Sequence, residues 1–220
     1  NFSLMIPDTQ AKCAVLGYGS WATAIVKTLT TNHHHVDWLV LNDDIRASLI
    51  ERGRNPKYLP WCDIDREYIT PSADINEVVR DANVIFLAMP SAFLTKFLAP
   101  LSESLRDKIV VSAVKGIIPG DYLTIVEHMN RYYDVPMSNI AVVTGPSHAE
   151  EVGQCRLSYL TVASEDTDTA KIVEGLLANE SLSIEDKALK ETDLSAYGYK
   201  VQGEEAGVKY YGSKLSLESE

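Results

Sequence analysis

Short runs of apolar residues alternate along the chain with segments in which apolar positions recur at helical spacing. The runs predict strands that are buried on both faces of a sheet, and the periodic segments predict helices. This alternation predicts an α/β fold with a doubly wound, mainly parallel sheet. The expected strands are 12–16, 35–41, 83–90, 108–116 and 157–164, the expected helices are 21–29, 43–53, 73–82, 91–101, 120–133 and 166–179, and residues 139–152 read as strand, turn and helix.

Ligands bind to such sheets in the crevice outside the carboxyl ends of the strands. Any binding or catalytic chemistry is therefore expected where the segments that follow the strands meet. These segments are 17–21, 41–43, 89–91, 115–116 and 144–149.

The first of these segments is a glycine turn, in which Gly17 to Ala22 fit the pattern G-x-G-x-x-A. In that pattern Gly17 permits a sharp turn, Gly19 lets the backbone approach a pyrophosphate, and the small Ala22 lets helix and strand pack closely. Ser20 and Trp21 follow at the start of the expected helix, where free N–H groups favour a phosphate. The turn predicts a Rossmann-type dinucleotide site, and a tight corner that holds no ligand is the alternative.

The end of the second expected strand bears on the choice between NAD and NADP. An acidic side chain there favours NAD, whereas a basic one favours NADP. Asn42 is neutral and no arginine is adjacent to it, which favours NAD. Asp43 and Asp44 can equally serve only to begin the next helix, so the expected cofactor is NAD or NADP.

Composition and charge limit the classes of partner. The chain has 20 lysine and arginine residues against 31 aspartate and glutamate residues, a net charge of −11. No general basic face for nucleic acid is expected, so local N–H groups and a few placed lysines must hold any anion. No apolar run reaches the length of a membrane span and no secretory signal is recognised, so a cytoplasmic location is expected.

Several stretches taken together resemble the bacterial type of NAD(P)-dependent glycerol-3-phosphate dehydrogenase. They read GYGSWATAI, NPKYLP, AMPSAFL, VKGI and TGPSHAEEV, in the order and spacing of the family's N-terminal cofactor domain. The resemblance covers about residues 12–180, and NPKYLP and TGPSHAEEV are its most specific parts. It implies an oxidoreductase that transfers a hydride reversibly between NAD(P)H and dihydroxyacetone phosphate. The product, sn-glycerol 3-phosphate, would feed phospholipid synthesis.

The resemblance also implies roles for single residues. Lys115 would touch both cofactor and substrate, and the remaining residues would touch one of the two. On the cofactor these are Ser20 and Trp21 at the phosphates, Asn42 at the ribose, Tyr58 and Ala149, and on the substrate they are Gly145 and Ser147.

The position of Lys115 gives a separate reason for its role. It ends an expected strand at the binding edge, beside Gly116, and a dianionic substrate needs a cation there because the chain is acidic. An ordinary surface lysine is the alternative. On the other side of the expected cleft, Pro90 and Ser91 close the edge, with Phe93 as a packing or nicotinamide-side residue.

The segment Gly145-Pro146-Ser147 turns from strand to helix, so its backbone N–H groups can face an oxyanion or a phosphate. His148 follows it, and either a catalytic acid or a structural, hydrogen-bonded histidine fits that place. No metal is expected, because three adjacent histidines in a turn (residues 33–35) cannot all face one ion and the three cysteines lack zinc-ligand spacing.

Reducing a ketone needs a proton donor beside the carbonyl. In the family this is a lysine of a C-terminal helical domain, and nothing in the last forty residues matches it. Those residues are polar and contain no convincing strand or amphipathic helix. We expect a dinucleotide-binding domain over 12–180 and an unassigned tail over 181–220, either a remnant or a misread part of the helical substrate domain.

Two hypotheses remain for the function. The chain is a glycerol-3-phosphate dehydrogenase whose sequence is incomplete, with a homodimer as its possible assembly, or it is a dinucleotide-binding module that does not turn over. A different dehydrogenase with the same cofactor domain is a third option, against which TGPSHAEEV speaks.

Overall fold

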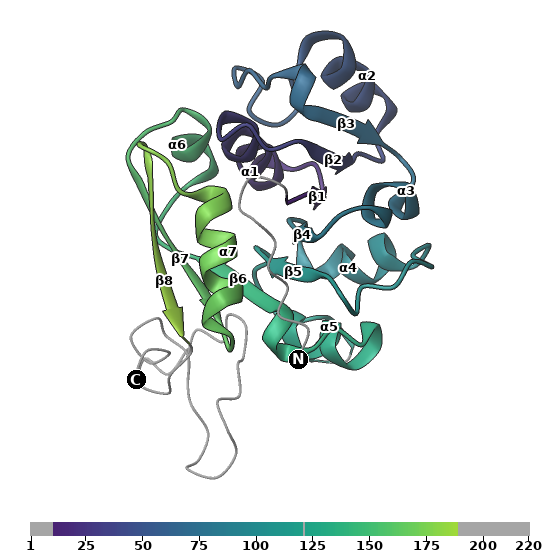
Figure 1. Cartoon of the computed structure of the whole chain (residues 1–220). Helices are drawn as coiled ribbons and strands as arrows, with labels where there is room; N and C mark the ends of the chain where they lie inside the picture. Colours follow the sequence, from purple (N-terminus) through teal and green to yellow (C-terminus); the bar gives the residue numbers. More distant parts are fainter. Residues whose placement is uncertain (1–10, 121, 189–220) are drawn as a thin grey trace, which may run out of the picture.

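The computed structural model describes residues 11–120 and 122–188 (Figure 1). Within these residues, one eight-stranded sheet runs in the order β3-β2-β1-β4-β5-β6-β7-β8. Strands β1 to β6 are parallel to one another, which confirms the mainly parallel, doubly wound α/β sheet. The strands are β1 Cys13–Leu16, β2 Val36–Leu39, β3 Ile69–Ser72, β4 Val84–Leu87, β5 Ile109–Ser112, β6 Ile140–Thr144, β7 Ser158–Ser164 and β8 Leu182–Ala188.

Helices cover the sheet on both faces (Figure 1). The apolar residues of α1, α2, α6 and α7 belong to one core cluster, and those of α3, α4 and α5 belong to the other. The helices are α1 Ser20–Thr31, α2 Asp43–Arg52, α3 Ile75–Arg80, α4 Ser91–Leu98, α5 Ile125–Tyr133, α6 Ala149–Gly153 and α7 Thr167–Leu177. No helix in the described part of the chain is both long and apolar enough to cross a membrane.

The central strands β1 and β4 are apolar throughout because each of their faces contacts a helical layer. In β1, Cys13 and Val15 lie in one core cluster, whereas Ala14 and Leu16 lie in the other. Successive strand residues point to opposite faces, so a strand with helices on both sides needs an unbroken apolar run. This is why the sequence pattern located the central strands well.

The order of the strands fixes where a ligand can bind. The chain passes from β1 outward through β2 to β3 and then returns to place β4 on the other side of β1. The carboxyl ends of β1 and β4 therefore flank a topological switch point, the place where open α/β sheets bind ligands.

Strand β7 departs from the parallel arrangement, because it is antiparallel to β6, with Thr144 opposite Thr161. The connection between them contains only the short helix α6 and does not carry the chain back to the opposite edge. As a result the start of β7, not its end, lies beside the carboxyl end of β6.

Two strands were not expected from the sequence. Strand β3 contains Pro71 and pairs only with β2, at the edge of the sheet, so it lacks the apolar run of a buried strand. Strand β8 pairs in parallel with β7 and carries the sheet to Ala188, past the predicted boundary at residue 180. The predicted tail beyond it, residues 189–220, lies outside the described residues.

Candidate functional site

The glycine turn connects β1 to α1 at the switch point. Gly17 has a φ of 118°, and a Cβ atom there would lie 2.3 Å from the carbonyl oxygen of Ala88, just after β4. The turn therefore needs glycine at this position both for its backbone conformation and for the close approach of the neighbouring strand.

The carbonyl groups of the turn are held by side chains from three parts of the fold. The Gly17 oxygen accepts a hydrogen bond from Trp38 Nε1 at 2.6 Å. The Tyr18 oxygen accepts from Asn55 Nδ2 at 2.9 Å. The Gly19 oxygen accepts from the hydroxyl and the backbone N–H of Thr23, both at 2.9 Å.

These bonds orient the backbone N–H groups on the other side of the turn. The described peptide bonds include no cis bond, and the C=O and N–H of a trans peptide point in opposite directions. Because the oxygens of residues 17–19 point toward the protein, the N–H groups of residues 18–20 point away from these anchors. Such a row of N–H groups, ahead of a helix N-terminus, is suited to bind an anion.

Gly19 differs from Gly17, since a Cβ atom there would meet no atom within 4 Å. Its φ of −78° and ψ of −173° are open to any residue. Neither the conformation nor the packing of the protein explains a glycine here. The sequence hypothesis that a ligand needs this space does explain it.

The start of α1 carries no compensating charge. Its first turn contains no acidic residue, whereas the first turns of α2 and α6 each contain two. Ser20 and Trp21 open this helix, and Ala22 is fully buried against the sheet, as the motif predicts for its small third position. The partial positive charge of the α1 N-terminus is therefore available to an outside anion.

Asn42 follows β2 and is the N-cap of α2, where its side-chain oxygen accepts from the Ile45 N–H at 3.0 Å. Asp43 pairs with Arg46, whose guanidinium also donates to the Val40 oxygen at 3.0 Å. The acidic residues thus begin the helix, one of the two alternatives left open. Arg46 brings a cation to the carboxyl end of β2, although it is not adjacent to Asn42 in the sequence but one helical turn further on.

Tyr58 lies half-buried in the loop of residues 55–62, called here the Tyr58 loop. Arg54 and Asp63 close the ends of this loop with two hydrogen bonds, at 2.5 and 3.1 Å. The hydrogen bonds from Arg54 lower the pKa of the Asp63 carboxyl, so this exposed carboxylate keeps its charge to a lower pH than an unpaired aspartate does. The ion pair fixes the loop that carries Tyr58 beside the glycine turn.

Lys115 and Phe93 are both exposed. Lys115 follows the carboxyl end of β5, next to Gly116 with its φ of 100°, and Phe93 lies in the first turn of α4, after β4. Both positions are on the predicted edge of the sheet, on the far side of β1 from Asn42.

The segment after β6 is joined to β7 by a side chain. The Ser147 hydroxyl donates to the Tyr159 oxygen at 2.7 Å and accepts from the Tyr159 N–H at 3.1 Å. Since a hydroxyl has one hydrogen, Ser147 in this arrangement offers a substrate only an acceptor lone pair. Gly145 has a φ of 142°, and a Cβ there would lie 2.7 Å from the same Tyr159 oxygen.

His148 and Ala149 mark the start of α6. His148 occupies the N-cap position, and its backbone N–H faces the Glu151 carboxylate at 3.4 Å. Ala149 packs partly buried against the core cluster that contains α1. This placement fits the structural alternative for His148, and its role stays a prediction.

Apart from Tyr58, which lies in the loop after α2, the predicted site residues follow the carboxyl ends of β1, β2, β4, β5 and β6 and therefore share one edge of the sheet. Sequence reasoning missed the residues that hold the turn, which are Thr23 one helical turn after Gly19 and the distant Trp38 and Asn55. In the described residues, no group of three or more histidine, cysteine, aspartate or glutamate side chains could hold a metal ion.

Comparisons with known proteins agree with this geometry. Residues 12–170 match the family described as the N-terminus of NAD-dependent glycerol-3-phosphate dehydrogenase. A glycerol-3-phosphate dehydrogenase [NAD(P)+] of Halalkalibacterium halodurans is 32% identical over 173 residues, which cover 78% of this chain and 50% of that protein. One of Pseudomonas syringae pv. tomato is 35% identical over 171 residues, covering 77% and 49%.

Solved structures show the same fold. The glycerol-3-phosphate dehydrogenase of Plasmodium falciparum matches with a TM-score of 0.74 at 20% identity, over 81% of this chain and 52% of that one. The enzyme of Coxiella burnetii matches with a TM-score of 0.71 at 23% identity, over 81% and 54%. The chain spans about half the length of the curated relatives it matches. It belongs to the NAD-dependent glycerol-3-phosphate dehydrogenase family, whose N-terminal part it matches.

Proposed function

We propose that this chain binds NAD or NADP at the glycine turn and forms the cofactor half of a glycerol-3-phosphate dehydrogenase. The observation that carries the proposal is the open space at Gly19, together with the anchored carbonyls around it. A pyrophosphate can approach the backbone there and meet N–H groups of the turn and of the α1 N-terminus. The names of the curated relatives support the same cofactors.

The proposed reaction is reversible hydride transfer between NAD(P)H and dihydroxyacetone phosphate, giving sn-glycerol 3-phosphate. The dinucleotide supplies the hydride when it is bound. The chain's own contribution is to orient the cofactor and to place Lys115 near the substrate, where its ammonium offsets the charge of a phosphate. The backbone at Gly145 and Ser147 completes the proposed substrate side.

A proton must reach the carbonyl oxygen as the hydride reaches the carbon. We do not assign this step to any of the described residues. By the family resemblance, the donor is a lysine in a C-terminal helical domain, which corresponds to the part of the relatives that this chain does not match. A binding module without turnover is therefore the second candidate, because none of the described residues is assigned as the proton donor.

The proposal is tested by titrating the purified chain with NADH and with NADPH and following the fluorescence of the reduced nicotinamide. Saturable binding at one site per chain supports the cofactor site, and no binding of either compound overturns it. Dihydroxyacetone phosphate is then added to the complex. Oxidation of the cofactor supports the dehydrogenase, whereas binding without oxidation supports the module.

The setting of the protein is part of the proposal. We infer a cytoplasmic enzyme that feeds phospholipid synthesis and assembles as a homodimer. Sedimentation of the purified chain tests the homodimer. A monomer at micromolar concentration would mean that these residues do not form dimer contacts.

A further inference from the structure

We propose that Asn55 is a positioning residue that sets the glycine turn and the Tyr58 loop in one fixed arrangement for the dinucleotide. This inference rests on the proposed function, because it assigns Asn55 to the same site. Asn55 is 0% exposed, although asparagine is rarely found fully buried.

All the hydrogen-bonding capacity of the Asn55 amide is used. Its Nδ2 donates to the Tyr18 oxygen at 2.9 Å and to the Thr23 hydroxyl at 3.0 Å. Its Oδ1 accepts from the N–H groups of Lys57 at 3.2 Å and Tyr58 at 3.1 Å. An amide has two donor hydrogens and two acceptor lone pairs, so every one of them has a partner.

The two sides of this amide contact two different parts of the site. The donors hold the glycine turn directly through Tyr18 and indirectly through Thr23, whose hydroxyl donates to the Gly19 oxygen. The Oδ1 atom accepts from the Tyr58 backbone N–H and so fixes the position from which the Tyr58 side chain extends. One planar group therefore sets the direction of the turn's N–H groups and the place of the tyrosine at the same time.

The chemistry of the position demands an amide. Aspartate has the same shape and keeps the acceptor contacts to Lys57 and Tyr58, but it would place a carboxylate oxygen against the Tyr18 carbonyl. Alanine would leave the buried groups on both sides without partners. Both substitutions therefore release the turn, whereas aspartate retains much of the loop contact.

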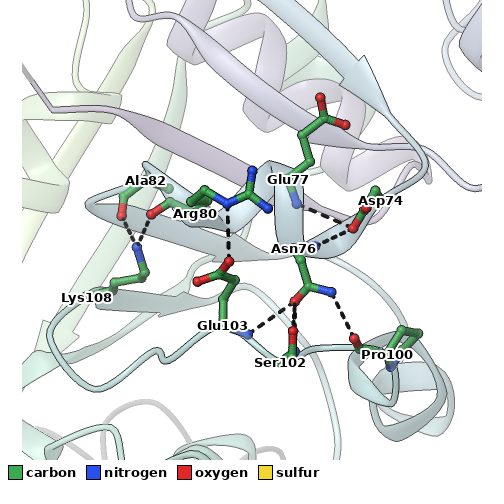
Figure 2. A network of polar contacts seen from close by, with 9 residues as sticks. All are labelled: Asp74, Asn76, Glu77, Arg80, Ala82, Pro100, Ser102, Glu103 and Lys108. Carbon is green, nitrogen blue, oxygen red and sulfur yellow. Dashed lines mark hydrogen bonds and ion pairs between the residues drawn. The ribbon is translucent and has the colours of Figure 1, made fainter.

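Asn76 offers a matched control. Its amide also joins distant segments, because Nδ2 donates to the Pro100 oxygen at 3.0 Å and Oδ1 accepts from the N–H groups of Ser102 and Glu103 at 2.7 and 3.2 Å (Figure 2). The same network includes Lys108, directly before β5, which donates to the Arg80 and Ala82 oxygens before β4, at the amino ends of the strands and opposite the glycine turn. Loss of this amide loosens the fold without touching the proposed site.

The experiment compares the wild-type chain with Asn55→Asp, Asn55→Ala and Asn76→Ala. Two quantities are measured for each: the dissociation constant of NADH by fluorescence, and the hydrogen exchange of peptides covering residues 17–21 and 56–59 without cofactor. We expect both Asn55 variants to bind NADH at least about tenfold more weakly than wild type. Exchange is expected to be faster in both peptides for Asn55→Ala and chiefly in 17–21 for Asn55→Asp.

Asn76→Ala is expected to bind NADH as wild type does and to leave both peptides unchanged, although its melting temperature falls. Should Asn55→Ala fail to fold, Asn55→Asp carries the test. NADH binding by the Asn55 variants that equals the Asn76→Ala value overturns the inference. If the wild-type chain binds no dinucleotide, the proposed function fails by itself. The hydrogen-exchange data then test separately whether Asn55 holds the glycine turn. Unchanged exchange at residues 17–21 in the Asn55 variants would show that it does not.

Discussion

Two glycines of one turn are glycines for different physical reasons. At Gly17 the neighbouring strand and a left-handed φ exclude a side chain, so the fold itself requires glycine. At Gly19 the space is open and the backbone is ordinary, so the fold does not require glycine, and we propose that a bound ligand does. The residue scale thus separates what the fold needs from what a ligand needs.

We predict that Gly19→Ala folds like the wild type and binds NADH at least about tenfold more weakly, because the added methyl group occupies the space of the pyrophosphate. Thermal unfolding and NADH fluorescence measure the two effects. Gly17→Ala is the contrasting variant and is expected to lose about 2 kcal/mol or more of stability. Unchanged NADH affinity in Gly19→Ala would falsify the ligand explanation.

Lys115 provides a second test at the residue scale. Lys115→Ala is expected to weaken the binding of cofactor and substrate and to leave the melting temperature unchanged, since the side chain is exposed at the rim of the sheet. Lys96→Ala, an exposed lysine of α4, is the matched control. The affinities for cofactor and substrate are measured by isothermal calorimetry. Equal affinities for the two variants would show that Lys115 is an ordinary surface lysine.

At the residue scale, the sequence predicted the positions of the glycine motif but not the side chains that hold the turn by hydrogen bonds. Gly17, Gly19 and Ser20 are found by local spacing alone. Trp38 and Asn55 act on the same turn from distant positions, and a single sequence contains no signal for contacts that form only after the sheet is assembled.

At the scale of elements, sequence pattern located those that bury continuous apolar surface. Helix α5 begins at Ile125 and not near residue 120, because Thr124 and Glu127 form a capping box that the local sequence T-I-V-E already contains. The sequence did not predict that β7 is antiparallel to β6, since a buried strand has the same residue pattern in either direction. Strand β8 was missed because its residues, LSIEDKA, form no continuous apolar run, with Leu182 buried and Ser183 exposed.

The joint between β6 and β7 gives a prediction for Ser147. Its hydroxyl pairs with both backbone groups of Tyr159, so Ser147→Ala is expected to lower the free energy of unfolding by about 1–3 kcal/mol. Urea unfolding measures this, with Ser138→Ala, an exposed serine before β6, as the control. A full loss of substrate binding with unchanged stability would instead make Ser147 a ligand-binding residue only.

At the scale of the whole molecule, the most buried ionisable group of the central strand links stability to pH. Burial, with a smaller effect of the Asp37 carboxylate, raises the pKa of Cys13 from 9.0 to about 12. Above about pH 9 the unfolded chain therefore loses the thiol proton while the folded chain keeps it. The unfolded state binds fewer protons, so stability falls as the pH rises from about 9 toward 12.

We predict that Cys13→Ala removes this part of the pH dependence, which amounts to at most about 1.4 kcal/mol per pH unit. The difference in unfolding free energy between variant and wild type is measured at several pH values across this window. Val15→Ala, a substitution in the same strand and core cluster, is expected to differ from wild type by a constant amount. A constant difference for Cys13→Ala as well would contradict the prediction.

The way in which the turn is held has a consequence for protein engineering. Three carbonyl groups of the G-x-G-x-x-A segment accept hydrogen bonds from Trp38, Asn55 and Thr23, and the first two of these lie outside residues 12–31. Residues 12–31 transplanted alone into another scaffold would contain the motif but would lack the Trp38 and Asn55 side chains, which orient its backbone N–H groups. The smallest portable unit is the segment that reaches from β1 to the Tyr58 loop, and a graft has to be judged by whether it brings those two side chains along.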